Sequence, residues 1–504
     1  MSAAHEVEPA PVRPVSSAQR TAPYVEALQA YLPTRRFRLH LPGHAGDSAG
    51  PAPFTELFGG RLAELDLMPM VDGIDLGPAP TPFDRSLALA AEAWGARRTW
   101  FLTNGASQGN HMVSIALRSL GDSLLVQRSV HASVIEAMVL TGAAARFVRP
   151  RIDAARGIAH GVTAEDVAAA LARMKAERGL PAAVYVVSPS YYGFVSDVAA
   201  IAAVAHAEGI PLVVDEAWGA HLGFHPRLPL GALRLGADLV VSSTHKQAGS
   251  LTQSAMLHLA DGPFAERLEP LLERAHRTMQ TTSESAVLRA SLDLTRRALV
   301  LGEAAIGETI RYADAVRDEL RRRGRFRIGS DDFREVPGWV ADDPLKIVVE
   351  TLPGGITGYE ARALLDAEGI LVELANESML VGVLGAGTTP RMDPAALVDT
   401  LMSLPVHAGR PPLPLPVPDE APARMTVREA YFAPSEIVSA REAVGRTSAD
   451  TVSAYPPGIP NLLPGEPVTA EAVEFLQAVG ASPYGHVRGA LDPEVSALRV
   501  VRDG

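Results

Sequence analysis

Between about residue 37 and residue 300, short runs of apolar, β-branched residues alternate with longer runs that have helical spacing. The helical runs include Ala164–Glu177 and Val198–Glu208, both rich in alanine. Strands that are apolar on both faces and alternate with helices form a mostly parallel sheet covered on both sides. The sequence therefore predicts an α/β fold, in which ligands bind at the carboxyl ends of the strands. The predicted strands are Thr99–Thr103, Ser123–Gln127, Ala183–Ser188, Pro211–Asp215 and Asp238–Ser242.

The pattern changes after a helical stretch, Ala286–Arg323, where strand-like runs such as Leu345–Glu350 and Ile370–Leu374 alternate with two further helical runs. This alternation of short strands and helices predicts a smaller α+β unit, followed by a stiff proline-rich connector. The predicted division is a disordered lead and arm (1–36), a large domain (37–300), a small α+β domain (301–409), a linker (410–423) and a C-terminal domain (424–504).

Composition excludes several classes of protein. The 504 residues include no cysteine, which excludes disulfides, thiolate metal sites and a cysteine nucleophile. A net charge of -12 argues against nucleic acid as a partner. No apolar run reaches the roughly 18 residues that a membrane span needs, and the first 20 residues do not resemble a signal peptide. We therefore expect a cytoplasmic protein without a membrane partner.

Two His-x-x-x-His pairs, His40 with His44 and His221 with His225, have the spacing of metal ligands. Pro42 and Gly43 would break a helix in the first pair, and the second lacks the adjacent glutamate of a zinc hydrolase. We therefore predict no metal site.

Lys246 is one of only three lysines in a chain in which lysine and arginine together number 46. It follows the predicted strand Asp238–Ser242 after three residues, at the edge of the sheet where ligands bind. Lysine forms a Schiff base with an aldehyde cofactor, and arginine cannot replace it. We therefore predict a pyridoxal phosphate (PLP) site with Lys246 as the nitrogen that bonds to the cofactor.

Asp215 closes the preceding strand and is predicted to pair with the protonated ring nitrogen of PLP, although an aspartate at such a turn also caps helices. The glycine turn Thr103–Asn110 precedes a predicted helix at Met112–Arg118 and is predicted to hold the phosphate on backbone N–H groups and the Ser107 hydroxyl. Ser243 and His245 flank Lys246 and are further candidate phosphate donors.

His131 follows the strand Ser123–Gln127 and is a candidate to stack on the PLP ring. A lone histidine is more often a loop or core residue, because imidazole fits many partly buried sites.

Six segments, in this order along the chain, resemble the Orn/Lys/Arg decarboxylases, which are fold-type I PLP enzymes. They are Leu41-Pro-Gly-His44, Thr103-Asn-Gly-Ala-Ser107-Gln-Gly-Asn110, Ser188-Pro-Ser-Tyr-Tyr-Gly193, Val214-Asp-Glu-Ala-Trp-Gly-Ala-His221-Leu-Gly-Phe-His225, Ser243-Thr-His-Lys246 and Tyr455-Pro-Pro-Gly-Ile-Pro460. The resemblance runs from about residue 37 to the C-terminus, at the length of the shorter bacterial type without an N-terminal wing domain.

The resemblance implies a fold like that of aspartate aminotransferase and decarboxylation of arginine, lysine or ornithine, as in polyamine biosynthesis. It assigns catalysis to Lys246, Asp215, His131 and His245. It implies that the cofactor also contacts Ser107, Gln108, Ser188, Ala217, Trp218 and Ser243. Family members are at least homodimers with the active site at the interface, so Thr282 and Ser283 are expected to reach the neighbour's phosphate. His221 and Glu466 are candidate substrate contacts.

Three departures from the family pattern are visible: Ala45 and Ala132 stand where a lysine is usual, and Gly73–Pro80 replaces a Leu-Asp-Asp-Leu-His motif near the substrate. The last departure leaves open which basic amino acid is the substrate. Two other functions also remain open, a PLP-dependent aminotransferase or oxygen-using oxidase, and a catalytically silent regulatory relative.

Overall fold

The computed structural model describes residues 16–34, 38–46, 54–177, 179–407, 423–455, 460–482 and 485–502. The predicted disordered lead as far as residue 15, the linker as far as residue 422, and residues 456–459 of the Tyr455–Pro460 motif lie outside the described residues.

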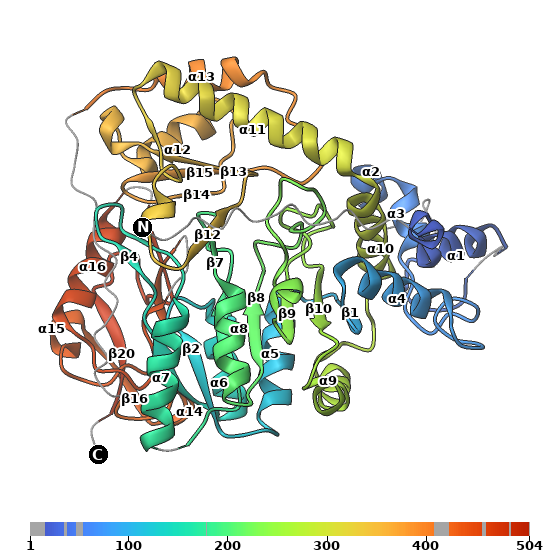
Figure 1. The fold of residues 1–504 in the computed structure, drawn as a ribbon, viewed down its shortest axis with the longest axis horizontal. Helices are drawn as coiled ribbons and strands as arrows, with labels where there is room; N and C mark the ends of the chain where they lie inside the picture. The colour runs from blue at the N-terminus through green and yellow to red at the C-terminus, as the bar shows by residue number, and fades with distance from the viewer. Residues whose placement is uncertain are drawn as a thin grey trace.

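A seven-stranded sheet forms the centre of the molecule, with strand order β1-β10-β9-β8-β6-β2-β3 (Figure 1). Every neighbouring pair is parallel except the two that β10 makes with β1 and β9. The predicted α/β class is therefore confirmed. The strands are β1 (Arg98–Leu102), β2 (Ser123–Gln127), β3 (Ala144–Val148), β6 (Val184–Val187), β8 (Leu212–Asp215), β9 (Leu239–Ser242) and β10 (Ala255–Leu259).

Helices cover both faces of this sheet because successive strand residues point to opposite sides. Val213 and Val241 pack in one core with α5 (Gly105–Leu117), α6 (Ala132–Thr141) and α9 (Ala265–Met279). Val214 and Val240 pack in a second core with α7 (Ala164–Glu177) and α8 (Val198–Ala207). Gly109 lets α5 lie close to the sheet, since a Cβ there would stand 2.8 Å from Val241 Cγ1.

The smaller α+β unit is a four-stranded antiparallel sheet with order β11-β13-β15-β14, covered by three helices (Figure 1). A two-stranded sheet, β7 (Phe194–Ser196) with β12 (Trp339–Asp342), ties this unit to the large domain. The elements are β11 (Arg327–Ile328), β13 (Lys346–Glu350), β14 (Leu374–Ala375), β15 (Met379–Val383), α11 (Glu303–Arg323), α12 (Gly358–Ala367) and α13 (Pro394–Ser403).

The predicted strand Ile370–Leu374 is mostly wrong, since only Leu374 and Ala375 pair in the sheet. Gly369 adopts a left-handed conformation, and the Ile370 N–H donates to Leu365 O at 2.8 Å. Ile370 therefore closes the end of α12 instead of starting a strand.

The N-terminal arm packs on the large domain through α1 (Pro23–Tyr31), α4 (Pro82–Trp94) and α10 (Ala286–Leu301), at the right of Figure 1. The buried Arg296 holds this arm by donating to Gln19 O at 2.7 Å and pairing with Asp293 at 2.8 Å. Short helices α2 (Phe54–Phe58) and α3 (Gly60–Leu65) follow α1.

The C-terminal unit has its own apolar core and lies beside the large domain, at the left of Figure 1. Arg128 of the large domain donates to Pro460 O at 2.8 Å and so joins the two units. The unit contains α14 (Val427–Phe432), β16 (Ser435–Ser439), α15 (Ala440–Ala443), β17 (Val452–Tyr455), β18 (Pro460–Leu462), α16 (Ala470–Ala481), β19 (His486–Arg488) and β20 (Ala497–Val501). Within the described ranges, no helix is both long and apolar enough to span a membrane.

Candidate active site

The predicted site residues lie where neighbouring parallel strands end. Asp215 is the last residue of β8, and Lys246 follows β9 after three residues. His131 follows β2 and Ser188 follows β6, whereas α5 begins just after β1. Because β2, β6, β8 and β9 are mutually parallel, these residues gather at one edge of the sheet.

Asp215 forms a buried anionic end of the site. The residue is only 3% exposed, and its carboxylate accepts from the Ala217 N–H through Oδ1 at 3.0 Å and from Asn110 Nδ2 through Oδ2 at 3.1 Å. In the described part of the chain, no side-chain cation lies within 4.0 Å of it. A buried carboxylate without a cationic partner is costly, so this arrangement suits a ligand that brings a positive nitrogen.

Asn110 connects Asp215 to its surroundings. Its amide nitrogen also donates to Ser133 Oγ at 2.8 Å, and its oxygen accepts from the Tyr185 hydroxyl at 2.7 Å. Ser133 in turn contacts His131, whose Nδ1 accepts from the Ser133 N–H at 3.2 Å. Asn110 and Tyr185 were missed as site residues. Two features of the sequence could have pointed to them. Asn110 is a polar residue on the buried face of a helix, and Tyr185 is a tyrosine in an otherwise aliphatic strand.

His131 is the N-cap of α6. Burial lowers its pKa, with Lys246 acting in the same direction and Asp215 opposing it. The imidazole is therefore held mainly neutral at neutral pH, in a fixed orientation, as a ring that stacks on a flat ligand requires.

Lys246 forms the opposite, cationic end. Its Nζ stands 3.9 Å from the centre of the Trp218 ring. Burial lowers the pKa of Lys246 to about 8, although Asp215 and Glu373 both act to raise it. A lysine that loses its proton this readily is a competent nucleophile near neutral pH.

Lys346 was missed by sequence reasoning, although it is another of the three lysines. It is 2% exposed, and its Nζ lies 4.3 Å from the centre of the same Trp218 ring. It donates to Ser190 O at 3.1 Å and to Tyr191 O at 2.9 Å. The scarcity of lysine that singled out Lys246 was a signal for this residue too.

The glycine turn forms the first turn of α5, which begins at Gly105 rather than at the predicted Met112. Asn104 at the N-cap makes no side-chain cap, so N–H groups remain available at the helix start. Gln108 instead holds the turn, since its Oε1 accepts from the Asn104 N–H at 3.1 Å and its Nε2 contacts Gln280. Ser107 is half-buried and Ser243 is buried.

His245 turns its Nδ1 to Ser254 O at 2.7 Å, and burial lowers its pKa. Ser188 is buried, with Oγ accepting from the Ser196 N–H at 3.1 Å. Thr282 and Ser283 are exposed.

The two candidate substrate contacts are engaged elsewhere. His221 is fully buried, and its Nε2 lies 3.1 Å from Asp343 Oδ1. Glu466 Oε2 accepts from Arg128 Nη2 and from the Leu463 N–H, both at 3.0 Å. Their predicted contact with substrate stays a prediction.

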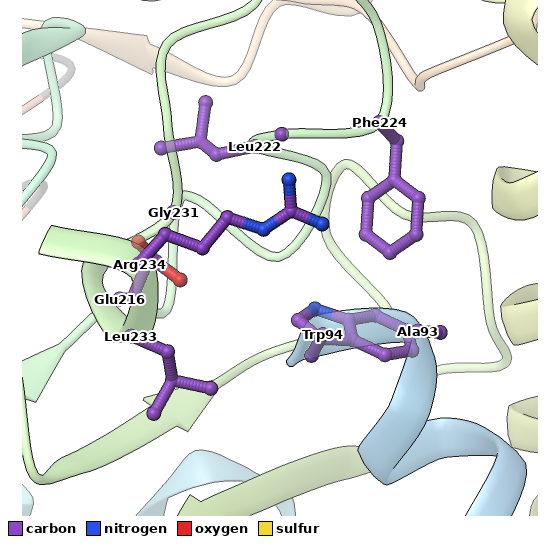
Figure 2. A pocket seen from close by; sticks show the side chains of 9 residues that line it. Ala93, Trp94, Glu216, Leu222, Phe224, Gly231, Leu233 and Arg234 are labelled. Atoms are coloured by element: carbon purple, nitrogen blue, oxygen red, sulfur yellow. The ribbon is translucent and has the colours of Figure 1, made fainter. Parts of the chain in front are cut away.

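A separate hollow is lined in part by Glu216, which follows Asp215 in the chain (Figure 2). Trp94, Phe224 and Arg234 line it, and its lining includes none of the predicted site residues. Burial raises the pKa of Glu216 to about 8, and its Oε1 accepts from the Ala232 N–H at 2.7 Å. Glu216 therefore has a structural role next to the site.

The chain matches two family models, Orn/Lys/Arg decarboxylase major domain over residues 22–332 and Orn/Lys/Arg decarboxylase C-terminal domain over residues 415–483. It is 33% identical to an arginine decarboxylase of Halalkalibacterium halodurans, covering 97% of this chain and 99% of that protein. It is 31% identical to an arginine decarboxylase of Bacillus subtilis, covering 96% and 99%. The constitutive lysine decarboxylase of Escherichia coli is 23% identical, covering 90% and 76%.

Among solved structures, that lysine decarboxylase of Escherichia coli superposes with a TM-score of 0.78 at 21% identity, covering 96% of this chain and 82% of that one. This likeness independently supports the fold. The match of the major-domain model to more than half of the sequence, together with relatives above 30% identity along nearly the whole length, is decisive. The chain belongs to the Orn/Lys/Arg decarboxylase family.

Proposed function

We propose that this enzyme uses PLP to decarboxylate arginine to the corresponding amine. The observation that carries the proposal is a pair of groups that have no ionic partner within 4.0 Å among the described residues: the buried carboxylate of Asp215 and the partly buried amine of Lys246. Both are supplied with partners by one flat ligand that has a basic nitrogen at one end and an aldehyde at the other.

The donor set of the site fits PLP. Lys246 would bond to the aldehyde carbon, and the Asp215 carboxylate would hold the proton on the ring nitrogen. The start of α5, with Ser107 and Ser243, would hold the phosphate on N–H and O–H donors. Gln108 serves this phosphate only indirectly, by fixing the turn through Asn104.

When bound, PLP supplies an electron sink for the pair left on Cα when CO2 departs. The residues of the chain supply the rest. Asp215 keeps the ring nitrogen positive, and Asn110 and Ala217 orient that carboxylate. His131 and Ala217 would cover the two ring faces, with Ser188 and Trp218 near the ring hydroxyl. Lys246 or His245 would return a proton to Cα.

Arginine is proposed as the substrate because relatives named arginine decarboxylase are 31–33% identical to this chain along most of its length. The lysine decarboxylases of Escherichia coli are 23–24% identical. The replaced motif near Asp75 is compatible with this choice, since Asp75 already pairs with Arg289 at 2.8 Å. Asp75 is thus occupied within the chain.

Glu373 offers an acid for the distal guanidinium. It is solvent-exposed, and its negative charge acts on Lys246. Glu466 is the other candidate, but Arg128 engages it. We expect Glu373→Gln to raise the KM for arginine about tenfold, the loss of one charge-assisted contact. The matched variant Glu466→Gln should instead weaken the junction with the C-terminal unit; a larger KM effect at Glu466 would reverse the assignment.

The protein is further proposed to be a cytoplasmic homodimer or larger homo-oligomer. The exposed Thr282 and Ser283 follow Gln280, which reaches the α5 turn through Gln108. This continuity supports a shared phosphate site between subunits. Sedimentation of the holoenzyme tests the assembly, and a monomer that retains full activity would contradict it.

The function is tested by measuring CO2 and amine from arginine, lysine and ornithine, with Lys246→Ala as the blank. We expect arginine to give equal amounts of CO2 and amine. A keto acid or peroxide without CO2 would establish the aminotransferase or oxidase alternative. No turnover of any amino acid by protein that binds PLP would favour a silent regulatory relative.

A further inference from the structure

Two β-turns lie next to the segment that carries His131, one from the large domain and one from the C-terminal unit. The large-domain turn, Gln127–Val130, ends β2 and is closed by a 3.2 Å hydrogen bond from the N–H of its last residue to the carbonyl of its first. The C-terminal turn, Leu463–Glu466, is closed in the same way at 3.1 Å. His131, the N-cap of α6, directly follows the large-domain turn. The position of that turn therefore sets where α6 and its capping histidine begin.

The C-terminal turn is specified by its own sequence, Leu463-Pro-Gly-Glu466. Proline at the second position and glycine at the third favour a type II turn, because the third position needs a positive φ. Gly465 has φ +92°, and a Cβ at this residue would collide with Met425 O. Glu466 thus leaves the turn from a defined place in the backbone.

An ion pair joins the two turns. Arg128, at the second position of the large-domain turn, donates to Glu466 Oε2 at 3.0 Å and to Pro460 O at 2.8 Å. The Arg128 and Glu466 side chains are only 5% and 14% exposed, so water screens the pair weakly. Burial lowers the pKa of Arg128 and Glu466 acts to raise it, so the carboxylate offsets part of the cost of burying this charge.

Apolar packing holds the same two turns together. Val130 and Leu463, one from each turn, are fully buried in one core. On its other side, the large-domain turn is tied to the sheet, since Gln127 Oε1 accepts from the Val187 N–H at 3.1 Å. The large-domain turn is therefore held from two sides, by the sheet and by the C-terminal unit.

We infer that Glu466 is a positioning residue for His131: through Arg128 it holds the large-domain turn and so sets where the His131 ring lies. The inference rests on the proposed function, in which that ring covers one face of PLP. The Ser133 N–H donates to His131 Nδ1 at 3.2 Å and orients the ring relative to α6. The large-domain turn places the start of α6 itself. Glu466 thus serves the site through Arg128 rather than by contact with the cofactor or the substrate.

A second part of the C-terminal unit acts on His131 through charge. Burial lowers the pKa of His131, and Lys246 and Arg488 act in the same direction. Asp215 and Glu136 oppose this effect. Arg488 lies on β19, and its Nη2 is 3.8 Å from Glu136 Oε1 on α6. The C-terminal unit is therefore near the start of α6 at β19 as well as at the C-terminal turn.

The first experiment measures amide hydrogen exchange of the full-length wild-type protein with and without PLP. If the two turns open together, PLP bound against His131 should slow exchange in both of them, by about fivefold or more. The peptide that contains α14 (Val427–Phe432) is the internal control, because it lies at the same junction without contacting either charged partner of the pair. Protection of the large-domain turn without protection of the C-terminal turn would overturn the inference.

The second experiment removes the charge of Glu466. Glu466→Gln keeps the size of the side chain, and exchange in the large-domain turn of the cofactor-free protein should become about tenfold faster. The visible circular dichroism of bound PLP should fall, since the ring loses a fixed neighbour. The kcat for arginine should fall about tenfold while KM stays within roughly twofold, because the displaced group positions the cofactor rather than the substrate.

Arg428→Met is the matched control. Arg428 also joins the C-terminal unit to α6, but at the far end of that helix, where it donates to Val139 O at 2.8 Å and to Leu140 O at 2.7 Å. We expect Arg428→Met to leave the dichroism of PLP and the exchange of the large-domain turn unchanged. Equal effects of Arg428→Met and Glu466→Gln, or no effect of Glu466→Gln, would show that Glu466 only joins the two units.

A double variant protects the test against loss of folding. Glu466→Gln alone leaves the buried Arg128 without its carboxylate, whereas Arg128→Met combined with Glu466→Gln leaves no buried charge unpaired. The double variant should fold and should still show faster exchange in the large-domain turn. Wild-type exchange and wild-type dichroism in the double variant would overturn the inference. If neither variant folds, the effect of PLP on wild-type exchange decides.

Failure of the proposed function gives a different result. A chain that binds PLP and responds to Glu466→Gln in exchange and dichroism, but releases no CO2 from arginine, would overturn the proposed reaction and keep this inference. An active arginine decarboxylase in which Glu466→Gln changes neither exchange nor dichroism would do the reverse.

Discussion

The two ends of the active site have opposite electrostatic designs. At the Asp215 end, one buried carboxylate is surrounded by neutral hydrogen-bond partners, Asn110 and the Ala217 N–H. At the Lys246 end, two amines lie beside one indole ring, and the charges of Asp215 and Glu373 favour a proton on Lys246. Neutral hydrogen-bond donors hold the negative charge of Asp215 in place, whereas Lys246 lies beside an indole ring that a second amine also approaches.

This difference matches different chemical tasks. An acid that must remain ionised through a reaction is best fixed by neutral donors, because they stabilise the negative charge without competing for the ligand's cation. An amine that must lose its proton is best placed in a dry site near a second positive charge. Four changes would break or sharpen this comparison, from the largest expected effect to the smallest.

Removing the amine should have the largest effect. Lys246→Ala is expected to lower the rate of amine formation more than about a thousandfold, since it removes the group that bonds to the cofactor. CO2 release from arginine measures the change, with Lys175→Ala as the matched lysine variant. Substantial activity in Lys246→Ala would place the reacting amine elsewhere.

Neutralising the acid should have the next largest effect. Asp215→Asn keeps the size of the side chain but removes the charge, and should reduce kcat by roughly 100–1000-fold, a typical loss for one preorganised electrostatic partner. PLP binding should persist, which visible absorbance of the holoenzyme measures. A reduction of kcat by tenfold or less would mean that the neutral hydrogen-bond network contributes more to the rate than the charge of Asp215 does.

The amine end should make stability depend on pH. Because the pKa of Lys246 is about 8 in the folded protein and about 10.5 when unfolded, the unfolded state binds more protons between these values. The cofactor-free protein should therefore gain stability as pH rises from 8 to 10.5, by about 3 kcal/mol from this residue. Lys246→Met should flatten that rise in urea unfolding. If the free energy of unfolding rises equally steeply with pH in Lys246→Met and in Lys175→Met, this prediction is wrong.

The smallest effect is expected in the neutral network. Tyr185→Phe removes the hydroxyl that donates to Asn110 Oδ1 at 2.7 Å, leaving a buried acceptor unsatisfied. We expect about 1–2 kcal/mol of lost stability and only a few-fold lower kcat, because Asn110 keeps its contact with Asp215. Thermal unfolding and kcat measure the two effects. A loss of activity as large as that of Asp215→Asn would show that the network sets the charge of Asp215.

Much of the central sheet was predictable because its strands are continuous apolar runs. Ser123–Gln127 and Lys346–Glu350 were predicted to within a residue. The start of α5 was predicted seven residues late, since Gly105 and Gly109 are poor helix formers. Packing decided otherwise, because Gly109 allows close approach to Val241.

The site was predictable where its residues sit at strand ends in sequence. Asp215 and Lys246 could be paired because strand-to-helix turns of a parallel sheet meet at one edge. Asn110 and Tyr185 could not, because their partnership with Asp215 depends on the rotation of α5 against β6 and β8, which local pattern does not encode.

The α/β class and the family followed from the sequence alone, as did the hypothesis that Lys246 is the reacting lysine, because these rest on apolar periodicity, ordered motifs and the rarity of lysine in this chain. Only the tertiary structure brought Lys346 to the same Trp218 ring as Lys246. The position of Lys346 depends on the pairing of β7 with β12, which docks the small unit on the large domain and carries Lys346 to the Ser190–Tyr191 turn. Residues so far apart in sequence meet through long-range packing, and the charge environment of a buried amine exists only after that packing has removed water.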